Sequence, residues 1–118
     1  MLSEIAREFA DEIALHDWSD APWRPDRAGH HYSDDDGSPK QTEQLDPEHA
    51  DNIRTNVMWV TAQVLISHDP QLDLYEYAVA CGVPERLIHG QDGARSGIVP
   101  NGIRRGADGT PAAPGSRA

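Results

Sequence analysis

The residues with the clearest metal-binding chemistry lie in one stretch, where His30 and His31 precede three aspartates, Asp34, Asp35 and Asp36. Imidazole nitrogens and carboxylate oxygens suit zinc, manganese or calcium. The spacing nevertheless matches neither the HExxH zinc motif nor the twelve-residue calcium loop with its closing glutamate. A solvated acidic loop is therefore the expected state, and the sequence predicts no metal and no cofactor.

Catalytic residue types are present, but they follow no recognisable pattern. Six histidines occur, at positions 16, 30, 31, 49, 68 and 89, and none belongs to a known nucleophile–base motif. The chain contains neither a GxxxxGK[ST] phosphate loop nor a GxGxxG dinucleotide motif. Cys81, the only cysteine, falls on a predicted apolar stripe, and a buried thiol is a poor nucleophile. We therefore expect no enzymatic activity.

Residues 73–89 have the layout of a helix-turn-helix. Asp73 is a candidate N-cap, and Gly82 is suited to the left-handed turn that follows a helix. In a DNA-binding protein the second helix would present Arg86 and His89, and two further arginines, Arg104 and Arg105, would contact phosphates. However, Glu85 lies beside Arg86 and would repel phosphates. DNA binding is therefore an alternative to ordinary helix packing.

Charge is unevenly distributed along the chain, whose formal net charge is −10. Residues 1–81 contain 17 acidic and 5 basic side chains, whereas residues 82–118 contain 3 and 5. An acidic body repels nucleic-acid backbones and anionic membranes. Any nucleic-acid contact would then come from the carboxyl-terminal third, unless the acidic surface itself mimics a nucleic acid.

The candidate metal-binding, catalytic and nucleic-acid-binding residues must be positioned by helices, because apolar side chains recur every three or four residues along the chain. The pattern predicts helices over residues 3–17, 46–67 and 74–81, with a short helix over 84–89. The expected fold is all-α, a small bundle of three main helices and a short fourth. The bundle forms a domain over residues 1–90 that includes a long loop, 19–44.

The predicted helix 46–67 is apolar on two sides. One stripe should face the core and comprises Ala50, Ile53, Val57, Val60 and Val64. The second stripe contains Met58, Trp59 and Ile66, residue types that are common both in cores and at protein interfaces. We leave both interpretations of the second stripe open, and a protein partner or self-association would use it.

Residues 91–118 form a Gly/Pro/Arg-rich tail with little apolar periodicity. Asn101 and Gly102 between aliphatic residues indicate a short hairpin over 97–104. From residue 107 onward the composition is that of a flexible, disordered segment.

The stretch Asn56-Val57-Met58-Trp59-Val60, continued through Gly82-Val83-Pro84, resembles small accessory proteins of phages that infect high-GC actinobacteria. The usage of nine arginines against one lysine is similar to theirs. The resemblance implies a regulatory or host-interaction role and transfers no activity to any residue.

The combined prediction is a non-enzymatic interaction or regulatory protein that binds a protein partner, and the resemblance implies that it is phage-encoded. The longest mostly apolar window, residues 57–66, falls short of the roughly twenty residues that span a membrane. We therefore expect a cytoplasmic protein that does not enter a membrane.

Overall fold

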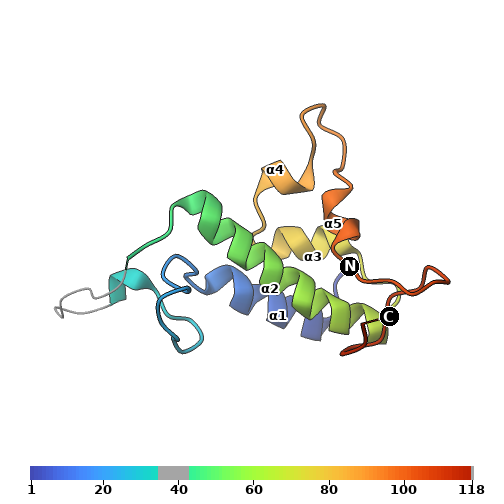
Figure 1. The fold of residues 1–118 in the computed structure, drawn as a ribbon, viewed down its shortest axis with the longest axis horizontal. Helices are drawn as coiled ribbons and strands as arrows, with labels where there is room; N and C mark the ends of the chain where they lie inside the picture. Colours follow the sequence, from blue (N-terminus) through green and yellow to red (C-terminus); the bar gives the residue numbers. More distant parts are fainter. Residues whose placement is uncertain (35–42, 118) are drawn as a thin grey trace.

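The computed structural model describes residues 1–34 and 43–117 and consists almost entirely of helices and loops. The helices are α1 (Glu4–Leu15), the 3-10 helix η1 (Tyr32–Asp34), α2 (Pro47–His68), α3 (Leu74–Ala80), α4 (Glu85–Ile88) and α5 (Ile98–Asn101). Figure 1 shows them, with α2 as the longest element. Extended pairing in the described ranges is limited to two isolated bridges. The all-α prediction is confirmed.

The helix ends follow from local capping signals. Ser3 caps α1 by accepting a hydrogen bond from the Ala6 amide, and Asp46 caps α2 directly before Pro47. Asp73 caps α3 by accepting from two backbone amides. Gly82 ends that helix region at a φ of 87°, which a residue without Cβ adopts at no steric cost.

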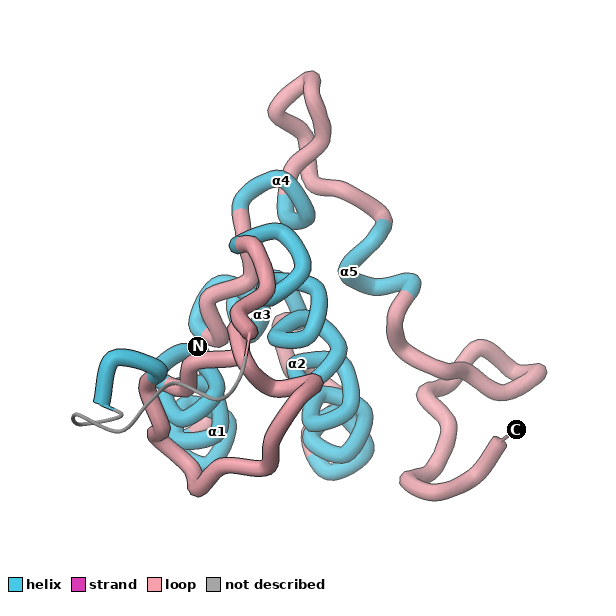
Figure 2. Tube along the Cα trace, turned by 60° about the vertical axis from the view of Figure 1, so that its left-hand side comes forward, coloured by secondary structure: helices cyan, strands magenta, loops and turns pink. Residues whose placement is uncertain are grey.

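The core lies where α1, α2 and α3 pack together (Figure 2). The core contains four completely buried alanines: Ala6, Ala10, Ala62 and Ala78. Small side chains let helices approach closely. Ile5 and Phe9, also on α1, stay outside this core and are 55 % and 42 % exposed.

The prediction that the valine stripe of α2 faces the core is wrong at Val60 and Val64, although Val57 is partly buried against the core. Val60 is 69 % exposed and Val64 is 43 % exposed, whereas Met58, Leu65 and Ile66 are buried. Both sides of α2 are apolar, so helical periodicity alone does not select one. The longer side chains on the second stripe remove more apolar area from water when they are buried.

The carboxyl-terminal segment packs against α2, which corrects two further predictions. Residues 98–101 form α5 in place of the hairpin expected over 97–104. The expected disorder from residue 107 is also wrong, because Ala112 is buried together with Val99 and Ile103. The orange and red chain in Figure 1 accordingly returns from α5 toward the end of α2.

Two matching turns interrupt this segment, at residues 90–94 and 106–110. In each turn the first glycine donates to the carbonyl four residues later, Gly90 to Ala94 and Gly106 to Thr110. An aspartate side chain then accepts from an amide two residues on. The sequences GQDGA and GADGT therefore encode the same local structure, since Asp and Gly both favour such turns.

Candidate functional site

The predicted nucleic-acid-binding residues all contact the protein itself. Arg86 reaches the Glu48 carbonyl, and His89 pairs with Glu85 one turn earlier. Arg104 and Arg105 donate to carbonyls in their own segment, at 3.2 and 3.1 Å. The helix that would enter a DNA groove, α4, has only four residues. A single turn is a short platform for reading bases.

The predicted protein-interaction residues lie mainly inside the molecule. Met58 is 0 % exposed and Ile66 is 6 % exposed, so both belong to the core. Trp59 is partly buried, and its indole N–H donates to the Val99 carbonyl at 2.9 Å. The second apolar stripe of α2 therefore forms part of the protein's own core at these positions, and is not an exposed partner surface there.

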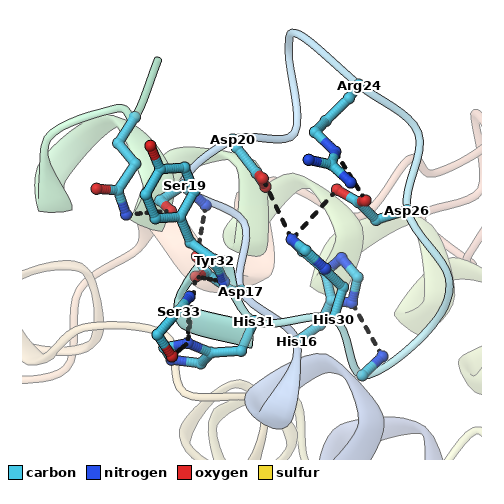
Figure 3. A network of polar contacts seen from close by, with 12 residues as sticks. His16, Asp17, Ser19, Asp20, Arg24, Asp26, His30, His31, Tyr32 and Ser33 are labelled. Carbon is cyan, nitrogen blue, oxygen red and sulfur yellow. Dashed lines mark hydrogen bonds and ion pairs between the residues drawn. The ribbon is translucent and has the colours of Figure 1, made fainter. Parts of the chain in front are cut away.

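The loop between α1 and η1 contains a buried polar cluster, shown in Figure 3. His30 Nε2 lies 3.2 Å from Asp20 Oδ2 and 3.5 Å from Asp26 Oδ2. The three side chains are 9 %, 1 % and 8 % exposed, respectively. The second oxygen of Asp26 accepts from Arg24 Nε at 2.9 Å. In the part of the chain that the structure describes, these three residues form the group suited to a metal ion.

Hydrogen bonds around Asp17 shape the backbone that carries this cluster. The Asp17 carboxylate accepts from the Ser19 and Tyr32 amides at 2.9 and 2.8 Å, and its own amide donates to the His30 carbonyl. Burial alone would raise the pKa of Asp17, but the hydrogen bonds from Ser19 and Tyr32 outweigh it and lower that pKa. The Trp18 indole N–H donates to the Ile13 carbonyl and ties the loop to α1.

The residues that the sequence grouped with His30 are not the ones the structure places beside it in the described ranges. His31 is exposed and contacts Ser33, while Asp34 belongs to η1. Asp35 and Asp36 lie outside the described residues. The aspartates that join His30 are Asp20 and Asp26, ten and four positions earlier, a spacing that matches no known metal motif.

A separate feature lies on the surface of α1, where two apolar and two acidic side chains alternate. Ile5, Glu8, Phe9 and Glu12 line a shallow hollow of about 220 Å³. These positions recur at three- and four-residue intervals, so they share one side of the helix. The hollow therefore combines exposed apolar surface with negative charge.

Compared with known proteins, the chain matches no protein-family model, no curated protein and no solved structure. The resemblance to phage accessory proteins stays a prediction. Within the described residues, no helix has both the length and the hydropathy that crossing a membrane requires.

Proposed function

We propose that this protein is a non-enzymatic interaction protein whose helix α1 binds a basic, amphipathic segment of a protein partner. The observation that carries the proposal is the exposure of Ile5 and Phe9 beside Glu8 and Glu12 around one hollow. Exposed apolar groups next to charges suit a partner that offers aliphatic and cationic side chains together. A regulatory role as a phage-encoded accessory protein agrees with such a surface and stays a prediction.

Charge favours a basic partner over a second copy of this chain. The sequence of α1 contains four acidic residues and only one basic residue, Arg7. Two such helices brought face to face would repel each other, and the net charge of −10 adds to that repulsion. A lysine- or arginine-bearing helix would instead neutralise Glu8 and Glu12 while its apolar side chains cover Phe9.

The test measures how the protein binds a fluorescent amphipathic peptide of lysine and leucine. Fluorescence anisotropy reports the binding at about 50 mM and at about 200 mM salt. We expect Phe9→Ser to weaken binding about tenfold or more, because a buried phenyl ring is worth about 1.5–3 kcal/mol. The matched control is Val60→Ser, which also removes an exposed apolar side chain but lies on α2. Its affinity should equal that of the wild type.

Two results would overturn the proposal. The first is no peptide binding by the wild type at low salt, or equal losses in Phe9→Ser and Val60→Ser. The second is a wild-type dimer in light scattering that becomes a monomer in Phe9→Ser, since a second copy would then occupy the face.

A further inference from the structure

We infer that Asp20, Asp26 and His30 form a binding site for a divalent transition-metal ion, with Zn²⁺ the best fit. The site lies in the loop between α1 and η1, and the inference is independent of partner binding at α1. It rests on the separation of the donor atoms, an unpaired buried oxygen and the chemistry of the donors.

Two of the donor separations, those from His30 Nε2 to Asp20 and to Asp26, match the spacing of zinc ligands. The two carboxylate oxygens nearest His30 Nε2 lie 3.2 and 3.5 Å from it, and one donor atom from each residue lies within 4.8 Å of the others. Ligands about 2.0–2.1 Å from zinc at the corners of a tetrahedron are about 3.3 Å apart. The three side chains therefore converge on one point that an ion can occupy once the two aspartate oxygens close to the tetrahedral separation.

The second oxygen of Asp20 supplies independent support. Asp20 is completely buried, and its Oδ1 has no hydrogen-bond partner among the described residues. A buried carboxylate oxygen without a donor or a cation is costly. His30 Nε2 carries at most one proton, so it satisfies one carboxylate oxygen at a time. A cation in the cluster would stabilise both carboxylates and offer Asp20 a bidentate contact.

The donor set selects the kind of ion. One imidazole nitrogen and two carboxylates provide three protein ligands and leave a fourth position for water, as in open zinc sites. Calcium requires six to eight oxygen ligands, and magnesium prefers an all-oxygen octahedron. Arg24 holds Asp26 Oδ1, which leaves Asp26 Oδ2 facing His30. A bound ion would fix the loop that runs from residue 20 to residue 30.

The test is calorimetric titration of chelator-treated protein with Zn²⁺, combined with thermal unfolding with and without the ion. We expect the wild type to bind one equivalent and to unfold at a higher temperature when it is loaded. Asp20→Asn keeps the shape of the side chain but removes its charge, and it should weaken binding at least about tenfold. His30→Ala should abolish binding.

His49→Ala is the matched control, because His49 also contacts an aspartate, Asp46, but at an exposed position. It should bind Zn²⁺ as the wild type does. Circular dichroism of the metal-free variants checks their folding, and Asp26→Asn replaces His30→Ala if the latter unfolds. The inference fails if the wild type takes up no stoichiometric Zn²⁺, or if Asp20→Asn and His49→Ala bind it equally well.

Discussion

The side chain of Gln63 pairs with the backbone of Arg104 in both directions. Gln63 Oε1 accepts from the Arg104 amide at 2.8 Å, and Gln63 Nε2 donates to the Arg104 carbonyl at 3.1 Å. The same nitrogen also donates to the Ala112 carbonyl at 3.0 Å. A buried glutamine of α2 thus substitutes for a neighbouring strand and holds the carboxyl-terminal segment in place.

Replacing Gln63 should release this segment. We expect Gln63→Ala to lower the free energy of unfolding by about 2 kcal/mol, because it leaves the Arg104 amide and the buried Ala112 carbonyl without a partner. Urea unfolding measures the loss, and limited proteolysis should show faster cleavage after residue 103. Gln71→Ala is the control, since Gln71 is exposed. Equal stability of the two variants would contradict the proposed role of Gln63.

Gly102 is required because the Trp59 ring lies against it. A Cβ at position 102 would approach the indole to 2.1 Å, far inside contact distance. Gly102→Ala should therefore destabilise the protein by about 1–3 kcal/mol through overpacking. At the other end of α5, a Cβ on Gly97 meets its nearest atom at 3.6 Å, so Gly97→Ala should be neutral. Thermal unfolding followed by tryptophan fluorescence distinguishes the two variants, and similar midpoints would refute the close contact.

The orientation of α2 predicts very different losses of stability at two positions that are close in sequence, Met58 and Val60. Met58→Ala should cost about 2–5 kcal/mol, because it opens a cavity in the core. Val60→Ala should change stability by less than about 0.5 kcal/mol, because Val60 is largely exposed. Denaturant unfolding of both variants checks this, and a larger loss at Val60 would mean that the valine stripe is buried after all.

The buried thiol predicts how stability depends on alkaline pH. Burial raises the pKa of Cys81 from 9.0 to about 12, and the neighbouring Tyr77 hydroxyl also has a raised pKa because it is buried. Below pH 9.0 the thiol is protonated in both states. As the pH rises from 9.0 toward about 12, the unfolded thiol ionises first, so the folded state loses stability.

Urea unfolding across that pH range measures the effect. Cys81→Ala should show a shallower decline than the wild type, with the remainder due to Tyr77. In the folded wild type at neutral pH, a thiol reagent should react slowly with Cys81, and it should react fast once urea is added. Parallel declines in the wild type and the variant would show that Cys81 does not contribute.

Sequence patterns located the helices because their signals are local. The cap at Asp73 and the turn at Gly82 depend on residues within one helical turn, and the structure confirms both. The turns at 90–94 and 106–110 were equally local, and their shared Gly-x-Asp-Gly pattern is a signal that sequence reading missed.

The face of α2 that enters the core was decided by tertiary packing. Two apolar stripes of similar strength leave the choice to what the neighbouring helices present, and here the Met58 side of the helix is buried in the same core as alanines of α1 and α3. Capture of the carboxyl-terminal segment by Gln63 joins residues 41 to 49 positions apart. Hydrophobic periodicity in the sequence does not predict a contact between residues so far apart.

The amino-acid sequence by itself therefore determined where α1 to α4 lie, but not α5, because capping and turn geometry act over a few residues. The tertiary structure decided which side chains meet, including the grouping of Asp20 and Asp26 around His30. That grouping depends on the path of an irregular loop, which is set by contacts with α1 and η1 rather than by any repeat in the sequence.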